Sequence, residues 1–185
     1  MASQAAPDQL ELVRGFVNTR ELDPDVEAIE TPDALAAWLS DRGLLADGAE
    51  LVESDLRRAH EFREALRSLM LANNGAPLDP AAVDTVNAAV GDAALSIRFG
   101  GDGEPELAVE ASGLDAAIAR LAAIVYEAKV DGTWRRLKVC AADDCRWAFY
   151  DRSRNRSGTW CAMGVCGNRN KVRAYRERQA GAARG

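Results

Sequence analysis

The feature that most constrains this chain is the placement of its four cysteines, which all lie within residues 140–166. Cys140, Cys145, Cys161 and Cys166 form two close pairs with the spacing C-x4-C-x15-C-x4-C. Two such pairs separated by a short excursion are typical of a four-thiolate zinc site, in which each pair forms one knuckle. The spacing therefore predicts one structural zinc ion, because four thiolates close the coordination shell and leave no position for a substrate.

Three other interpretations of the cysteines stay open: free structural thiols, a redox pair, and two disulfides. A redox pair usually has the spacing C-x-x-C, which the four cysteines do not have. The start of the sequence lacks the basic and apolar regions of a secretory signal, and no stretch reaches the roughly 18 apolar residues of a membrane span. We therefore expect a cytoplasmic protein, in which disulfides are rare. His60 lies far from the cysteines in sequence, and we expect it on a helix surface or at the edge of the core.

The charge of the chain changes sign near residue 134. Residues 1–133 carry a net charge of −15 and residues 134–185 a net charge of +9, which together give the formal −6 of the whole chain. Such asymmetry favours an acidic body with a basic interaction module. We expect a body of residues 1–133, a zinc module of residues 134–180 and a disordered tail of residues 181–185.

The acidic body has mainly helical patterns, with one exception. Thr31 before Pro32, and Asp79 before Pro80, are helix N-cap signals. Between the last two helical patterns, two alternating segments flank a glycine-rich turn, which predicts a β-hairpin. The expected fold class is therefore mainly α with a small β-hairpin (α+β). The expected helices are residues 8–20, 31–45, 54–75, 78–90 and 113–130, and the expected strands are 94–99 and 105–111.

Arginines follow the strand-like segment "WAFY" between the two cysteine pairs. Arg152, Arg154 and Arg156 alternate with small polar residues, so all three point to one face if the extended geometry continues. Arginine suits phosphate recognition, because its planar guanidinium binds two oxygens and keeps its charge. The sequence thus predicts a phosphate-binding face in this excursion.

A second basic segment begins directly after Cys166 and has the pattern of a helix. Asn168 is a candidate N-cap. At about 100° per residue, Arg169, Arg173 and Arg176 fall in one stripe, with Lys171 beside it. Val172, Tyr175 and Gln179 form an adjacent stripe that we expect to pack on the zinc module.

Clustered cations near aromatic residues predict a nucleic-acid surface. Two alternatives stay open: the basic face docks on the acidic body, or it binds RNA or an acidic protein. We expect no enzyme, because the sequence has no glycine-rich phosphate loop, no H-E-x-x-H and no nucleophile paired with a histidine. Short palindromic DNA sites would favour a homodimer.

The body itself has one candidate ligand site. Asn18, Thr19 and Arg20 form a polar group after the first helical pattern. Asn18 and Arg20 could contact a small-molecule effector, although the same residues could equally form a helix C-cap and a surface charge.

The segment "CAADDCRWAFYDRSRNRSGTWCAMGVCGNRNKVRAYRER" (140–178) resembles the CGNR zinc-finger proteins of bacteria, including the sequence Cys166-Gly167-Asn168-Arg169 that names them. The stretches "FVNTR" (16–20), "TPDALAAWL" (31–39) and "FREALRSLM" (62–70) resemble the ABATE domain that accompanies this finger. The resemblance implies zinc held by the four cysteines and a stress-related transcription regulator whose finger binds DNA.

Overall fold

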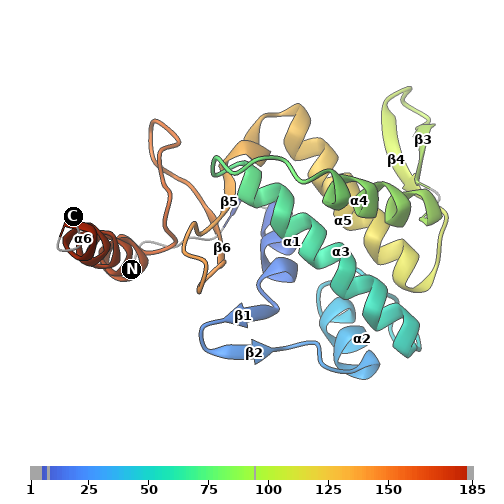
Figure 1. Ribbon diagram of the computed structural model, residues 1–185. Helices are drawn as coiled ribbons and strands as arrows, with labels where there is room; N and C mark the ends of the chain where they lie inside the picture. Colours follow the sequence, from blue (N-terminus) through green and yellow to red (C-terminus); the bar gives the residue numbers. More distant parts are fainter. Residues whose placement is uncertain (1–5, 8, 94, 183–185) are drawn as a thin grey trace.

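The long helix α3 is the centre of the body in the computed structural model, which describes residues 6–7, 9–93 and 95–182 (Figure 1). It contacts four other helices and the strand β5 (Leu137–Val139), and its buried side chains include Phe62 and Leu66. The body helices are α1 (Leu10–Val17), α2 (Pro32–Ser40), α3 (Glu53–Ala72), α4 (Pro80–Asp92) and α5 (Gly113–Val130). The five helices expected from the sequence are thus confirmed, with ends that differ by a few residues.

Local capping explains where two of these helices begin. The Thr31 hydroxyl accepts a hydrogen bond from the Ala34 backbone N–H at 3.2 Å, and the Asp79 carboxylate accepts one from the Ala81 N–H at 3.0 Å. In both cases proline follows the cap at the first helical position, where its missing N–H costs nothing. Both N-cap predictions are confirmed.

Within the described residues the strands form three antiparallel pairs, each with two strands. The hairpin β3–β4 is the predicted one, and Ile97 lies opposite Leu107 in its register. A second hairpin, β1–β2, turns at a cis Asp23–Pro24 peptide and was not expected from the sequence. The mainly α fold class is confirmed, with these additional short strands. The strands are β1 (Arg20–Leu22), β2 (Asp25–Glu27), β3 (Leu95–Phe99), β4 (Pro105–Val109), β5 (Leu137–Val139) and β6 (Ala148–Tyr150).

The third pair, β5–β6, follows the 3₁₀ turn η1 (Thr133–Arg136) and belongs to the main core. Leu137, Val139 and Ala148 are fully buried in the same cluster as the helices of the body. The net charge of the chain changes sign near residue 134. The hydrophobic core nevertheless continues past residue 134 into the β5–β6 pair. An independent folding unit of residues 134–180 stays a prediction.

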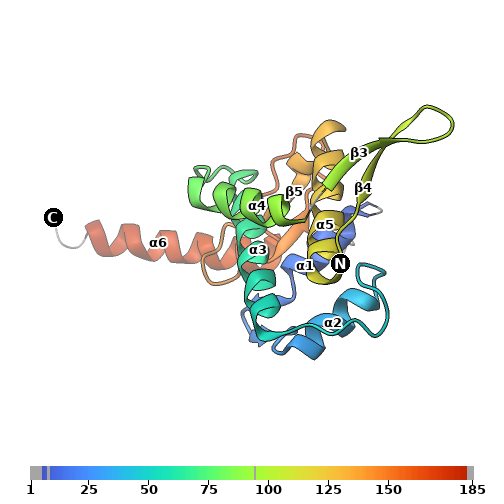
Figure 2. The same cartoon turned by 90° about the vertical axis from the view of Figure 1, so that its right-hand side faces the viewer.

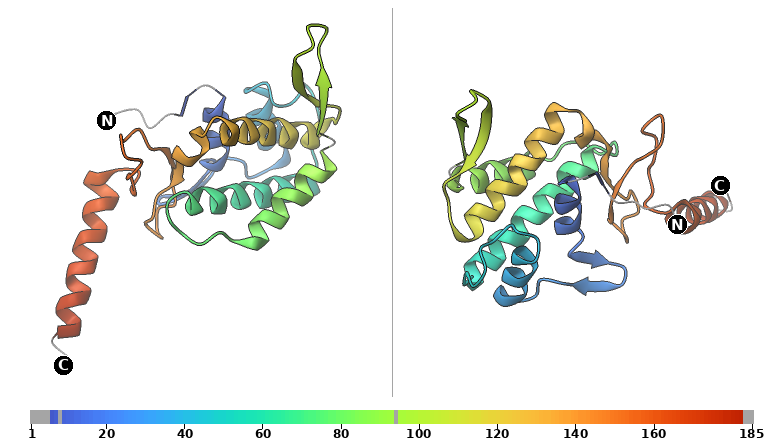
Figure 3. Two further views of the ribbon diagram at one scale, coloured as in Figure 1. Left: turned by 90° about the horizontal axis from the view of Figure 1, so that it is seen from above. Right: turned by 180° about the vertical axis from the view of Figure 1, so that it is seen from behind.

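The last helix, α6 (Asn168–Ala182), leaves the body instead of packing on it. Figures 2 and 3 show it extending into solvent from the end of the molecule that holds the β5–β6 pair. It is preceded by a π-helical turn, η2 (Met163–Gly167). Helix α6 ends at Ala182, residues 183–185 lie outside the described part, and the disordered tail of residues 181–185 stays a prediction. None of the described helices combines the length and apolarity needed to cross a bilayer.

Candidate metal centre and basic helix

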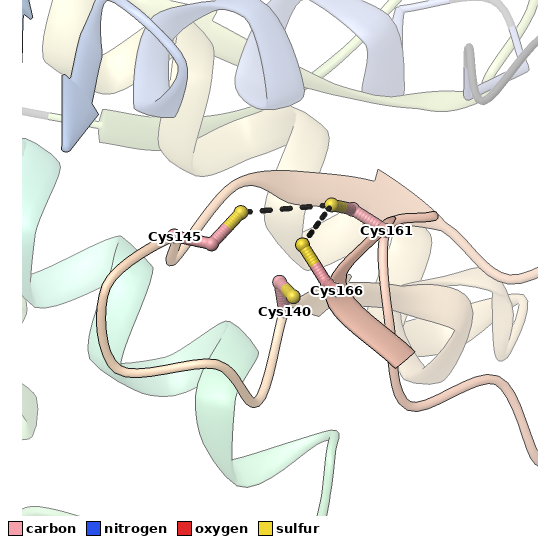
Figure 4. Close-up of side chains that lie close together, drawn as sticks. All are labelled: Cys140, Cys145, Cys161 and Cys166. Atoms are coloured by element: carbon pink, nitrogen blue, oxygen red, sulfur yellow. Dashed lines mark hydrogen bonds between the residues drawn. The ribbon is translucent and has the colours of Figure 1, made fainter. Parts of the chain in front are cut away.

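The four cysteines meet at the base of α6. Their sulfur atoms all lie within 4.8 Å of one another (Figure 4), and the four residues are Cys140, Cys145, Cys161 and Cys166. The first pair lies in the connection between β5 and β6, and the second lies in the segment that ends in η2. The β5–β6 pairing and the η2 turn thus bring together two knuckles that are distant in sequence.

The geometry and chemistry of this cluster fit one zinc ion. The sulfur of Cys161 lies 3.6 Å from those of Cys145 and Cys166. Zn–S bonds of about 2.3 Å in a tetrahedron place sulfurs about 3.8 Å apart, close to these distances. All four thiols are free, and Cys140 and Cys166 are buried. Four thiolates complete the shell, so zinc has a structural role here.

Ionisation of all four thiols requires a cation. Hydrogen bonds from Cys145 and Cys161 lower the pKa of Cys140 to about 2. The hydrogen bond with Cys140 raises the pKa of Cys145 to about 12, and that of Cys161 is raised as well. Adjacent sulfurs cannot all carry negative charge unless a divalent ion neutralises them, because like charges at this distance disfavour ionisation.

Tight packing explains the glycine that follows Cys166. A Cβ atom at Gly167 would lie 2.5 Å from the Met163 sulfur and 3.1 Å from Cδ1 of Trp160. Trp160 itself packs on the small cluster formed by the cysteines. A larger residue at this position would therefore push on the aromatic cover of the metal centre.

Asn168 does not cap a separate helix, which corrects the sequence prediction. Its backbone is helical, because the π turn η2 continues directly into α6. The Asn168 side chain donates to the Gly164 carbonyl at 3.2 Å, and Asn170 donates to the Cys166 carbonyl at 2.9 Å. These bonds attach the first turn of α6 to the second knuckle, so the metal centre sets the direction of the helix.

Arg169 connects the zinc module of residues 134–180, called the finger from here on, to the body of residues 1–133. Its guanidinium lies 2.9 Å from the Asp23 carboxylate in the β1–β2 turn and 3.1 Å from the Asp144 carboxylate in the first knuckle. The hydrogen bond with Asp23 raises the pKa of Arg169. The sequence placed Arg169 in a nucleic-acid-binding stripe, but these contacts support a structural role instead.

Asparagines of the body hold the finger through its backbone. The Asn18 side chain donates to the Ala148 carbonyl at 2.9 Å and accepts from the Ala148 N–H at 2.8 Å. At the end of α3, Asn74 donates to the carbonyls of Val139 and Thr159, both at 2.8 Å. Both polar atoms of Asn18 thus serve the joint between body and finger, and these contacts give no support to the ligand contact expected from the sequence. Arg20 forms an ion pair with Asp25.

Arg67 is the charged centre of the same joint, and the sequence analysis missed it. Its side chain is 8% exposed and donates to the carbonyls of Val17, Arg20 and Arg146 at 2.6–3.1 Å. The Glu64 carboxylate balances its charge at 2.8 Å. Arg63 and Arg67 are both buried on α3, and two arginines beside its apolar stripe are the sequence signal that could have indicated a buried anchor. His60, as expected, is half-buried at the edge of the core, where its ring lies 3.0 Å from the Ile29 carbonyl.

The arginine-rich excursion after β6 forms a turn, so the expectation of a continued strand is wrong. Arg156 has a left-handed φ of 53°, and its N–H donates to the Ser153 carbonyl. Asp151 organises this turn with a carboxylate that accepts from Lys138 at 2.8 Å and from the N–H groups of Ser153 and Gly158. Arg152, Arg154 and Arg156 are exposed.

The Lys138–Asp151 ion pair is buried, with both side chains at most 5% exposed. Burial alone would raise the pKa of Asp151, but the ammonium of Lys138 and the N–H groups of the turn together lower it to about 2. Lys138 also donates to the carbonyls of Arg156 and Gly158. The turn is therefore fixed from its interior by charge.

The cations of α6 beyond its first turn lie on the surface. Lys171, Arg173 and Arg176 are exposed. Val172 and Tyr175 are 49% and 57% exposed, so they do not pack on the zinc module as the sequence suggested. In Figure 1, the excursion rises from the metal centre while α6 is seen end-on, so the two basic segments leave the centre in different directions.

Comparison with known families agrees with this architecture. A family model described as "CGNR zinc finger" matches residues 136–179. A second model, named ABATE and described as "Putative stress-induced transcription regulator", matches residues 10–131. No curated protein matches the chain.

Proposed function

The chain belongs to the ABATE family and carries a CGNR zinc finger, and we propose that it is a transcription regulator that binds duplex DNA with helix α6. The observation that carries this proposal is that α6 projects from the body (Figure 2) and that its cations Lys171, Arg173 and Arg176 are exposed. We propose a cytoplasmic location as well, where chromosomal DNA is accessible.

The dimensions of α6 suit the major groove. A helix of 15 residues is about 22 Å long and about 10–12 Å in diameter, and the major groove is about 12 Å wide. Lys171, Arg173 and Arg176 can reach phosphates on the walls of the groove, while the exposed Val172 and Tyr175 offer apolar contacts to base edges. Two copies on a palindromic site would form a homodimer on DNA.

Binding fits this site better than catalysis. Four thiolates fill the zinc shell, so the ion has no position for a water nucleophile. His60 serves the core edge and takes no part in the metal cluster described here. We therefore propose a protein that recognises rather than transforms its partner.

Exposure of the α6 cations also argues against their docking on the acidic body. Lys171, Arg173 and Arg176 are on the surface, whereas Arg169, in the first turn of α6, pairs with the body carboxylate of Asp23. The negative charge of the body instead repels DNA phosphates, which favours an orientation with α6 in the groove and the body outside.

The test is the fluorescence anisotropy of zinc-loaded full chain with random duplex DNA at about 50 and 200 mM salt. Three phosphate contacts predict an affinity loss of about 40-fold between these concentrations, since each contact contributes about −0.9 to the slope of log K against log salt. Arg176→Ala should reduce that slope by about 1.

The matched control is Arg57→Ala, which removes the same charge from an exposed position on α3. It should leave the salt slope unchanged. The proposal would be overturned if the chain did not bind duplex DNA at about 50 mM salt, or if its affinity were the same at both salt concentrations. Equal effects of Arg57→Ala and Arg176→Ala on the salt slope would also overturn it. Tighter binding to single-stranded RNA than to the duplex, unaffected by Arg176→Ala, would point to an RNA-binding finger instead.

A further inference from the structure

The body contains an apolar cavity that the DNA-binding proposal does not use. It has a volume of about 410 Å³ and is lined by residues of α3, α4, α5 and the β3–β4 hairpin. Leu66 of α3, Val90 of α4, and Ala122 and Val125 of α5 are among its lining residues. Sites for small molecules usually have about 300–1,000 Å³, so the cavity suits a ligand of one or two rings or a short chain.

The cavity is accessible from solvent. Ile97 of β3 and Tyr126 of α5 belong to its lining and are 65% and 56% exposed. Large apolar side chains at such exposure mark an entrance where a ligand could bury them. The cavity is therefore a candidate binding site rather than a closed packing defect.

A polar atom without a partner lies in this lining. The hydroxyl of Ser96 is buried and has no hydrogen-bond partner within the described residues. A buried hydroxyl that forms no hydrogen bond is rare and costs free energy, because it has left water without compensation. A ligand with one polar group would satisfy this hydroxyl.

The charge of the lining indicates the sign of the ligand. Lys129 of α5 is the charged residue of the lining, which includes no aspartate or glutamate among the described residues. Its side chain is exposed, and its ammonium lies 5.4 Å from the centre of the ring of Trp134, which is not a lining residue. We propose that the cavity binds a small apolar carboxylic acid, whose carboxylate pairs with Lys129 and whose ring or chain fills the space between the helices.

The position of the cavity links it to the finger through α3. Phe62 and Leu66 face the cavity, whereas Arg67 on the same helix holds the backbone of the first knuckle. Asn74, just beyond the end of α3, holds the second knuckle through Thr159. Occupation of the cavity thus acts on the helix that anchors the finger. A ligand can bind in the cavity whether or not the finger binds DNA. The proposal of a ligand site and the proposal of DNA binding can therefore fail separately.

The test uses two fluorescent probes that differ in charge: anilinonaphthalene sulfonate, an apolar anion, and its uncharged analogue phenylnaphthylamine. We expect saturable binding of both by the zinc-loaded full chain. Ala122→Phe should weaken both at least about tenfold by filling the cavity, whereas the adjacent Ala123→Phe, which lies outside this lining, should leave both unchanged. Lys129→Gln should weaken the anion alone, by about three- to fivefold.

Each variant must keep the near-ultraviolet circular dichroism of the native chain, because the anionic probe also binds loosened proteins. If Ala122→Phe does not fold, Val90→Phe blocks the same cavity from α4. Non-saturable binding, or equal effects of Ala122→Phe and Ala123→Phe, would overturn the site. Equal loss of both probes in Lys129→Gln would overturn the assignment of an anionic ligand.

Discussion

Substitution of Asp151 by asparagine is the sharpest test of how the finger is built. The Asp151 carboxylate accepts from Lys138 at 2.8 Å and from the N–H groups of Ser153 and Gly158 at 2.9 and 2.8 Å. The Asp151→Asn side chain would keep one acceptor oxygen and would place an amide donor against the remaining donors. Lys138, which is 5% exposed, would lose its counter-ion but keep two carbonyl acceptors.

The size of the effect follows from this burial. Removing one partner of a buried ion pair costs about 3–5 kcal/mol, and the remaining carbonyls place this case near the lower end, at about 3 kcal/mol. The lowering of the Asp151 pKa from 3.8 to about 2 is compatible with it, since it corresponds to roughly 2 kcal/mol before solvent screening reduces the value. The control is Asp143→Asn, whose side chain is 75% exposed beside Arg146 and whose loss should cost under about 1 kcal/mol.

The assay is guanidinium unfolding of the full chain in excess zinc, followed by tryptophan fluorescence. A carboxylate with a lowered pKa stabilises the fold above its unfolded pKa, and this stability is lost as the pH falls toward 2. The difference between native and Asp151→Asn protein should therefore be constant from about pH 5 to 8. A loss below about 1 kcal/mol, or one that shrinks between about pH 8 and 5, would refute the reasoning.

Three further predictions concern the joint and the metal. Asn74→Ala removes two hydrogen bonds to the finger and should lower the free energy of chemical unfolding by about 1–3 kcal/mol. The control Asn87→Ala, at an exposed position of α4, should lower it by under about 0.5 kcal/mol. Equal losses in the two variants would contradict a role for Asn74 in the joint between body and finger. Arg169→Ala should leave the salt slope of DNA binding unchanged, because its guanidinium is occupied by Asp23 and Asp144; a decrease of about 1 would restore Arg169 to the DNA-contact set. Chelation of zinc should lower the far-ultraviolet helix signal, since α6 begins directly after η2 and Cys166, and one equivalent of zinc should restore it; an unchanged spectrum would show that α6 forms without the metal.

Features that depend on neighbouring residues were predictable. The caps at Thr31 and Asp79 bond to N–H groups two or three residues away, so their sequence signals sufficed. The β3–β4 hairpin has strands of five residues whose alternation is visible. The β1–β2 hairpin has strands of only three residues, too short for a period to appear, and it was missed.

The direction of charged side chains was the least predictable part of the site. Alternation suggested that Arg152, Arg154 and Arg156 share one face, but the buried carboxylate of Asp151 turns the chain there. Helical spacing placed Arg169 with Arg173, but carboxylates from distant segments bind it. Spacing states which residues share a face, and it does not state whether another part of the chain already occupies that face.

The sequence by itself determined the four zinc ligands, the helices of the body, and the presence of a basic helix after Cys166, because spacing and periodicity are local properties. Only the tertiary structure decided how the finger is attached and which arginines remain on the surface. Asn18 meets Ala148 across 130 positions, and Arg67 meets Arg146 across 79. Such contacts depend on how elements pack around a common core, and no local pattern records which distant carbonyl a buried amide or guanidinium will reach.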